Sequence, residues 1–244
     1  MKQFEKSIFS QIGQDGINEI LVHRIYGNPR SHFFVEIGTQ DGKQCNTRYF
    51  REAYGWNGLL IDGEYENPEI NLHKHFITVE NIVGILQKYN VQRDFQLLSL
   101  DIDQNTFYIL KKIMTSFRPD IIDVEYNSTH GPHEDKVVFY YDYAKWDKTN
   151  YFGGSLLSFY NMLRPLNYSL VYTESTGADA FFVKNEIINR KNLYFENIND
   201  VAKIYNSPKY GLGPDGGHPP DQFDRSYFTA DKACFFIGES LYGQ

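Results

Sequence analysis

Five short apolar segments alternate with helical segments along much of the chain, and this alternation constrains the fold more than any other feature of the sequence. The expected strands span residues 32–38, 58–62, 75–80, 95–103 and 120–126. The expected helices span residues 13–26, 45–54, 81–89, a stretch that ends near Ser116, and residues 154–163. Such alternation is typical of an α/β domain, in which a mostly parallel sheet carries helices on both faces.

Two further apolar segments close the regular part of the chain. Residues 169–174 and 179–184 both predict strands, and only residues 175–178 separate them, which favours an antiparallel hairpin. Five parallel strands and this hairpin give a seven-stranded sheet of the Rossmann-like class, whereas a dehydrogenase would end on a sixth parallel strand. We therefore expect one domain over residues 1–185. Residues 186–244 are expected to pack against it as a lid, a wall of the substrate site or an oligomer contact.

Composition and charge narrow the classes of partner. The chain has 244 residues, a formal net charge of −7 and a pI near 5.5, which argues against nucleic acid, because nucleic-acid binding rests on basic patches. The sequence contains no run of about 18 apolar residues, so we expect no membrane span. The two cysteines, Cys45 and Cys234, make no disulfide framework, which favours a reducing, cytoplasmic compartment. The sequence indicates no particular oligomeric state.

A glycine-containing segment, VEIGTQDG at residues 35–42, follows the first expected strand. Its spacing is acid-x-Gly-x-x-x-Gly, with Glu36, Gly38 and Gly42 at the defined positions, and differs from the G-x-G-x-x-G loop that presents a helix N-terminus to a pyrophosphate. Glycines allow a tight turn and close approach of a ligand, while the acid would repel phosphate and attract a cationic amino-acid group. The alternative is an ordinary turn between a strand and a loop.

Polar residues also stand at the ends of the next three expected strands. Asp62 ends the second strand and could accept both hydroxyls of a ribose, and Glu80 and Asn81 end the third, where an adenine edge would lie. Asp101 ends the fourth strand. Because the carboxyl ends of parallel strands meet at one edge of a sheet, these residues together predict a site for an adenosine-type cofactor.

A group of acidic residues at the fourth and fifth strand ends suits a metal ion. Asp101 and Asp103 are two positions apart, as are Glu125 and Asn127 on the neighbouring strand. Oxygen ligands of this kind suit Mg²⁺, Mn²⁺ or Ca²⁺, and we predict Asp101, Asp103 and Glu125 as the ligands. The alternative is a site without metal, in which the two aspartates position the cofactor and the substrate directly.

The same segments resemble the FkbM-type methyltransferases. The resemblance covers roughly residues 8–184. It is carried by SQIGQDGINEI at 10–20, FVEIGTQDGKQCNTRYF at 34–50, GWNGLLIDGE at 55–64, LLSLDIDQNTFYIL at 97–110, IIDVEYN at 121–127, YFGGSLLSF at 151–159 and GADAFFV at 177–183. Gln104 departs from the glycine, and Gln14 from the acid, that are common in that family.

The resemblance implies S-adenosylmethionine as methyl donor and O-methylation of a sugar or glycan hydroxyl. The residues expected to bind the cofactor are Gln11, Glu36, Gly38, Gly42, Asn46, Asp62, Glu80, Asn81 and Asp101. The segment Ser10–Gln11 stands just before the first helix, and we expect it to close over the methionine end of the cofactor.

O-methylation needs a base for the hydroxyl proton. Asp103, and His130 or His133 in the loop after the fifth strand, are the candidates, and we predict Asp103 and His130. The aromatic stretch FYYDYAKWDKTNYFGG at 139–154 is expected to form either an acceptor wall that stacks on a sugar or a packed lid.

Two other functions stay open at this point. A glycosyltransferase could hold Mn²⁺ and a nucleotide sugar on Asp101 and Asp103, but this reading leaves Glu36, Gly38 and Asp62 unexplained. A non-catalytic module could have kept the cofactor fold, although acids along the whole sheet edge argue against it. A nicotinamide dehydrogenase is disfavoured by the glycine spacing and by the terminal hairpin.

Overall fold

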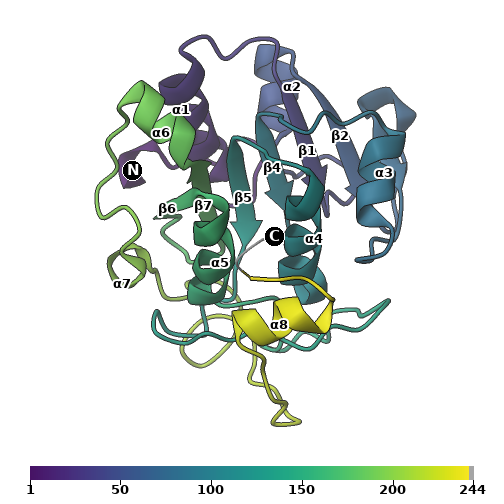
Figure 1. Ribbon diagram of the computed structural model, residues 1–244, viewed down its shortest axis with the longest axis vertical. Helices are drawn as coiled ribbons and strands as arrows, with labels where there is room; N and C mark the ends of the chain where they lie inside the picture. Colours follow the sequence, from purple (N-terminus) through teal and green to yellow (C-terminus); the bar gives the residue numbers. More distant parts are fainter. Residues whose placement is uncertain (242–244) are drawn as a thin grey trace.

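The computed structural model describes residues 1–241 and shows a seven-stranded sheet between two layers of helices (Figure 1). The strand order is β3-β2-β1-β4-β5-β7-β6. The strands are β1 Phe33–Ile37, β2 Asn57–Asp62, β3 Leu72–Lys74, β4 Leu97–Leu100, β5 Ile121–Glu125, β6 Tyr168–Thr173 and β7 Asp179–Lys184. Strands β1 to β5 pair in parallel, and β7 pairs antiparallel with both β5 and β6, so the predicted fold class is confirmed.

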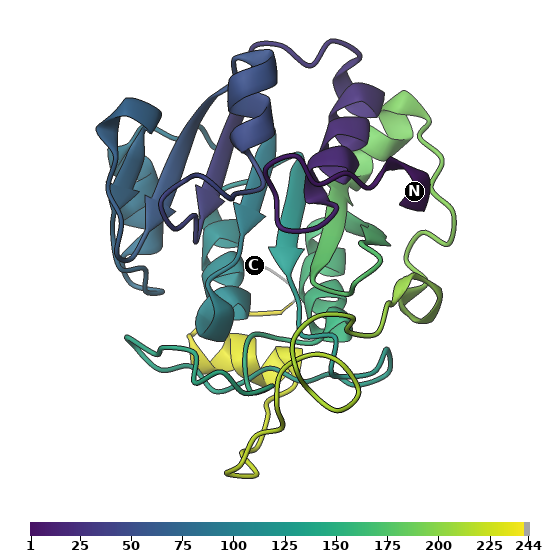
Figure 2. The same cartoon turned by 180° about the vertical axis from the view of Figure 1, so that it is seen from behind.

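Helices cover both faces of the sheet. The α-helices are α1 Gln14–Tyr26, α2 Arg48–Tyr54, α3 Ile82–Lys88, α4 Thr106–Ser116, α5 Leu156–Leu163, α6 Asn185–Lys191, α7 Val201–Ile204 and α8 Ala230–Phe236. Short 3-10 helices occur at Lys2–Phe4, Pro68–Ile70, Asp103–Asn105 and Arg164–Leu166. Helices α1, α2 and α6 lie on the face that Figure 2 turns toward the viewer, and α3, α4 and α5 lie on the opposite face. Among residues 1–241, no helix is both long and apolar enough to cross a membrane.

The two hydrophobic clusters follow the alternation of side chains along each strand. Phe34 packs with α1 on one face, whereas its neighbour Val35 joins the cluster under α4 on the other face. Leu97 and Leu98 divide in the same way. Because both faces of β1 and β4 are buried, these strands read in the sequence as nearly continuous apolar runs.

The third strand differs from its prediction. It spans Leu72–Lys74 instead of residues 75–80, and the chain then turns away from the sheet. The Asn81 side chain holds this turn, because it accepts a hydrogen bond from Thr78 N (2.9 Å) and donates one to Phe76 O (2.9 Å). The buried apolar side chains within residues 75–80 therefore belong to a turn and not to a paired strand. Neither Glu80 nor Asn81 ends a strand.

The fourth and fifth strands are also shorter than predicted. Strand β4 ends at Leu100, and Asp103 opens a 3-10 turn with φ +57°, so the two aspartates follow the strand rather than continue it. Strand β5 ends at Glu125, which pairs in register with Asp179 at the start of the antiparallel β7. This pairing brings an acid from β7 to the carboxyl edge of the parallel strands.

Loops and the C-terminal part of the chain gather below that edge, where the arrowheads of the parallel strands point (Figures 1 and 2). Two segments form this cover: the aromatic loop, residues 139–154, and the C-terminal segment, residues 206–228. Asn150 N donates to Pro219 O (2.8 Å), which joins the two segments. Helix α8 then packs against α4 and α5. The extension after residue 185 is thus in contact with the sheet domain.

Candidate active site

A cavity with two lobes opens at the carboxyl edge of the sheet, under the cover. The large lobe has a volume of about 600 Å³ and the small lobe a volume of about 300 Å³. Both lobes are lined by Gln11, Gly38, Gln40, Asp101, Glu125 and His218, which we call the junction. The position agrees with the rule that open α/β sheets bind ligands beyond the carboxyl ends of their strands.

Gly38 brings β1 and β4 together at the junction. Its φ is +90°, and a Cβ atom at this position would overlap the carbonyl oxygen of Asp101. Gly42 has φ +74°, and its added Cβ would lie 2.5 Å from Ile70 Cδ1. Gly42 lines neither lobe, so its hydrogen is required for packing, whereas Gly38 forms part of the cavity wall.

Glu36 lines the small lobe but uses its carboxylate to hold the loop after Gly42. Glu36 Oε1 accepts from Asn46 N (2.7 Å), and Oε2 accepts from Thr47 N (2.9 Å) and from the Thr47 hydroxyl. Burial raises the pKa of Glu36. The Asn46 amide reaches back to Ser99 Oγ (3.2 Å), so both predicted residues shape the lobe through a fixed network.

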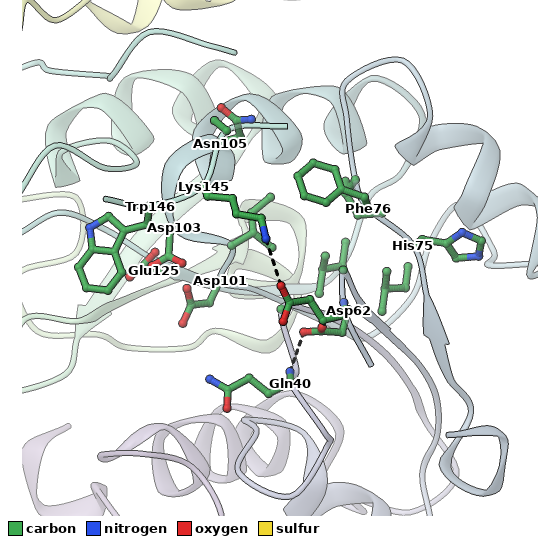
Figure 3. Close-up of a pocket in the computed structure, with 18 of the residues that line it drawn as sticks. Gln40, Asp62, His75, Phe76, Asp101, Asp103, Asn105, Glu125, Lys145 and Trp146 are labelled. Atoms are coloured by element: carbon green, nitrogen blue, oxygen red, sulfur yellow. Dashed lines mark hydrogen bonds and ion pairs between the residues drawn. The ribbon is translucent and has the colours of Figure 1, made fainter. Parts of the chain in front are cut away.

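Asp62 lies in the large lobe at the end of β2, as the sequence predicts (Figure 3). Its Oδ2 accepts a hydrogen bond from Gln40 N (2.8 Å), and its Oδ1 accepts one from Glu64 N (2.8 Å). Oδ1 also accepts from Tyr65 N (3.2 Å), whereas Oδ2 has Gln40 N as its single donor within residues 1–241, which leaves a lone pair of Oδ2 able to accept from a ligand.

The segment before α1 also reaches the cavity. Gln11 lines both lobes, while Asp15 Oδ2 accepts from the backbone N–H groups of Ile8 (2.8 Å) and Ser10 (2.8 Å). These bonds fold the segment into a loop over the small lobe. Of the predicted segment Ser10–Gln11, Gln11 is the residue that lines the cavity.

Glu80 and Asn81 do not line the cavity, which corrects their predicted place beside an adenine. Glu80 is exposed, and Asn81 bonds the turn that follows β3. Because β3 ends early, His75, Phe76 and Ile77 line the large lobe instead (Figure 3).

Asp101, Asp103 and Glu125 come together as the sequence predicts. One carboxylate oxygen from each lies within 4.8 Å of the others, and Figure 3 shows the three side chains side by side. Glu125 Oε2 is buried and has no hydrogen-bond partner within residues 1–241. Burial, and secondarily the neighbouring Asp101, raise the pKa of Asp103 to about 7 and that of Glu125 well above its usual range. An unpartnered buried oxygen beside two further carboxylates fits a hard cation.

Two more buried acids line up behind this group. Asp123 lies within β5, where Oδ2 accepts from Asn18 Nδ2 (2.6 Å) and Oδ1 has no partner among the described residues. Asp179 accepts from the Gln14 amide and lines the small lobe. Burial, with a contribution from Asp101, raises the pKa of Asp179 to about 8. The sequence analysis missed both acids because Asp123 interrupts an apolar strand and Asp179 reaches the edge only through antiparallel pairing.

His130 and Asn127 do not reach the acidic group. His130 is buried edge-on to Tyr227 (ring centroids 4.8 Å apart) and lines neither lobe, and burial lowers its pKa to about 4. The Asn127 amide donates to Asn150 O (2.7 Å) and Phe152 O (3.0 Å), which holds the aromatic loop. His133 is exposed on the surface. His130 therefore does not lie at the cavity, where a catalytic base would have to be.

The cover supplies residues that the sequence analysis did not single out. Lys145 and Trp146 of the aromatic loop line the large lobe, and Lys145 Nζ pairs with Glu64 across its mouth (3.2 Å; Figure 3). His218 lies against Trp146, with ring centroids 4.3 Å apart. The aromatic content of residues 139–154 was compatible with either a wall of the site or a packed lid, and nothing in GLGPDGGHPP indicated that His218 would join the cavity lining.

The strand order, the terminal antiparallel hairpin and the two helical layers define the Rossmann-like fold of class I methyltransferases. No family model matches the chain, and no curated protein matches its sequence. The FkbM-type resemblance therefore stays a prediction.

Several solved structures are similar in fold. The N-terminal domain of EvdMO1, crystallised in the presence of SAH and D-fucose, is 13% identical over 70% of this chain and 82% of that chain, with a TM-score of 0.43. An O-methyltransferase from Bacillus cereus in complex with SAH is 17% identical over 75% and 85%, with a TM-score of 0.43. The O-methyltransferase TomG from Streptomyces achromogenes in complex with SAM is 16% identical over 69% and 78%, with a TM-score of 0.40.

Proposed function

We propose that this protein is an S-adenosylmethionine-dependent O-methyltransferase that acts on a hydroxyl of a sugar or glycan with the help of a divalent cation. The observation that carries the proposal is the two-lobed cavity at the switch point of the sheet. Its large lobe offers a ribose acceptor, Asp62, and its small lobe is walled by buried acids.

The donor's two halves match the two lobes. Phe76, Ile77 and Ile102 give the large lobe apolar walls for an adenine, and Asp62 is placed for its ribose. Asp179 and the other acids of the small lobe favour the cationic ammonium group of a methionine and disfavour a pyrophosphate. When bound, S-adenosylmethionine supplies a methyl group activated by a sulfonium. We further propose that the Gln11 loop covers its methionine end.

Asp101, Asp103 and Glu125 would hold Mg²⁺ or Mn²⁺, because their oxygens converge and Glu125 Oε2 lacks any other partner in the described chain. When bound, the cation would bind acceptor hydroxyls and lower their pKa. A sugar suits this arrangement because it offers adjacent hydroxyls, and Trp146 at the large lobe offers a ring face for stacking.

The same acids also suit a metal-dependent glycosyltransferase, and ligand binding separates the two functions. S-adenosylhomocysteine at a hundred times its dissociation constant should raise the melting temperature by roughly 5–10 °C, whereas NAD and UDP-glucose should not. Asp62→Ala should weaken S-adenosylhomocysteine binding at least about tenfold, because the ribose loses its acceptor. Glu196→Ala, an exposed surface change, is the matched control. Stabilisation by UDP-glucose alone would favour the glycosyltransferase.

Turnover then tests the reaction and the metal together. Transfer of a labelled methyl group to a panel of monosaccharides and glycans should occur with Mg²⁺ or Mn²⁺ present and fall strongly after exhaustive chelation. Full activity without a cation would remove the metal from the proposal and leave the methyltransferase assignment intact. Binding of S-adenosylhomocysteine without transfer to any sugar would point to another acceptor class.

A further inference from the structure

His218 occupies the junction of the two lobes, and no side chain or backbone group within residues 1–241 forms a hydrogen bond with its ring. Its ring packs edge-on against Trp146 and Phe152 (centroids 4.3 and 5.6 Å apart), and Tyr210 lies 5.5 Å away. Neither ring nitrogen has a hydrogen-bond partner within residues 1–241, although the side chain is half-buried. An imidazole with free nitrogens that lines both lobes is available to a ligand.

The junction is where the reaction would take place, an inference that rests on the proposed function. With adenosine in the large lobe and methionine in the small lobe, the sulfur between them must lie at the junction, beside Gly38 and Asp101. The acceptor oxygen must approach the methyl carbon in line with the carbon–sulfur bond, from the side of the carbon opposite the sulfur. The cover supplies Lys145 and Trp146 to the large lobe and Tyr210 to the small lobe, and its His218 lines both lobes.

We propose that His218 is the catalytic base that takes the proton from the acceptor hydroxyl. The acceptor oxygen forms a bond to the methyl carbon while the carbon–sulfur bond breaks. The electron pair of the broken carbon–sulfur bond stays on the sulfur. The hydroxyl proton passes to a ring nitrogen of His218 and later to water. Burial lowers the pKa of His218, which keeps the imidazole neutral and able to accept a proton near neutral pH.

His75 and Asp103 are the other candidates for a base at the cavity, and each is engaged in another interaction. His75 lines the large lobe, but its Nε2 lies 2.8 Å from the Tyr89 hydroxyl. Asp103 belongs to the carboxylate group that would hold the cation, and a bound cation would reduce its basicity. The charged groups that share the cavity with His218 are Lys145 of the aromatic loop and the acids of the two lobes, which are Glu36, Asp62, Glu64, Asp101, Asp103, Glu125 and Asp179.

The test replaces His218 by asparagine and, separately, by glutamine, and measures donor binding and turnover on the best acceptor. Both variants should bind S-adenosylhomocysteine within about twofold of the parent, while kcat falls about 100-fold or more. Added imidazole should restore part of the turnover in the asparagine variant, which a purely structural role would not allow. His133→Gln, at an exposed histidine, is the matched control and should keep full activity.

The outcomes separate this inference from the proposed function. Parent-like kcat in either folded variant, or a loss in the folded asparagine variant that imidazole does not restore, would overturn His218 as the base while leaving the methyltransferase intact. Absence of S-adenosylhomocysteine binding in the parent protein would instead overturn the proposed function. Melting curves of the two variants show which of them is folded, and either folded variant decides the question.

Discussion

At Gly38 the chain leaves β1 with φ +90°, a backbone conformation that L side chains rarely adopt. The close approach of the Asp101 carbonyl at the same point leaves no room for a methyl group. A single residue therefore combines a strained turn, the contact between β1 and β4, and part of the cavity wall.

Gly38→Ala should consequently abolish binding of S-adenosylhomocysteine and reduce the free energy of unfolding by about 2 kcal/mol or more. The matched control is Gly84→Ala in α3, where an added Cβ meets no atom within 4 Å. That change should be neutral or stabilise the protein by about 0.5–1 kcal/mol. Calorimetric titration and chemical unfolding measure both effects, and donor binding by Gly38→Ala would contradict the role of this glycine.

Residues at strand ends could be predicted from the sequence, because a strand end fixes which edge of the sheet a side chain occupies. Asp62 and Asp101 are placed correctly for this reason. Asp179 and His218 were not predicted, since each reaches the site through pairing or loop contacts between segments far apart in the chain. His130 illustrates the opposite error, because a loop histidine close in sequence to the site is buried against Tyr227 instead.

Among the elements, β3 was misplaced because hydrophobicity alone does not distinguish a paired strand from a buried turn. Ile77 and Val79 enter the core from an unpaired segment, while the short strand Leu72–Lys74 carries little apolar surface. The presence and the parallel direction of the other strands before the hairpin followed from their alternation with helices. The cover could not be predicted, since its two segments are joined by specific contacts and not by a repeating pattern.

Arg225 makes several of the contacts between the aromatic loop and the C-terminal segment. Its Nη2 pairs with Asp147 Oδ2 (2.6 Å) and with Asp221 Oδ1 (2.8 Å), and its guanidinium lies 3.9 Å from the Tyr151 ring centroid. The contacts join three positions of the cover around one side chain. We infer that they position Trp146 and His218 against each other.

Arg225→Met should therefore raise the KM for the acceptor about tenfold and accelerate hydrogen exchange in residues 145–152. The melting temperature should fall by at most about 8 °C, because each of the two partly exposed ion pairs contributes at most about 1 kcal/mol. Arg190→Met is the control, since Arg190 is an exposed side chain far in sequence from the cover and pairs with the exposed Glu186 at 3.7 Å. Unchanged exchange in the aromatic loop would show that Arg225 does not organise the cover.

On the scale of the whole molecule, the dominant electrostatic feature is the concentration of acids along one edge of the sheet. Buried or cavity-facing carboxylates come from β1, β2, β5, β7 and the segment after β4, while the chain as a whole carries a net charge of −7. Such crowding is unfavourable when every carboxylate is ionised, and protons or bound cations relieve it. The pH dependence of stability should therefore report on the site.

The pKa of Asp179 decides whether its contribution to stability rises or falls with pH. Burial raises this pKa from the ordinary 3.8 to about 8 in the folded protein. The folded state then binds more protons than the unfolded state between these values, so this contribution to stability is complete below pH 4 and is lost as pH rises through 8. The melting temperature of the ligand-free protein should decrease between pH 5 and 9, and Asp179→Asn should make the decrease shallower. Glu196→Gln, which removes an exposed acid, should leave the parent's slope unchanged.

Mn²⁺ should raise the melting temperature most at the alkaline end, where the carboxylates near Asp101 are ionised, and an equal effect at all pH values would argue against cation binding there.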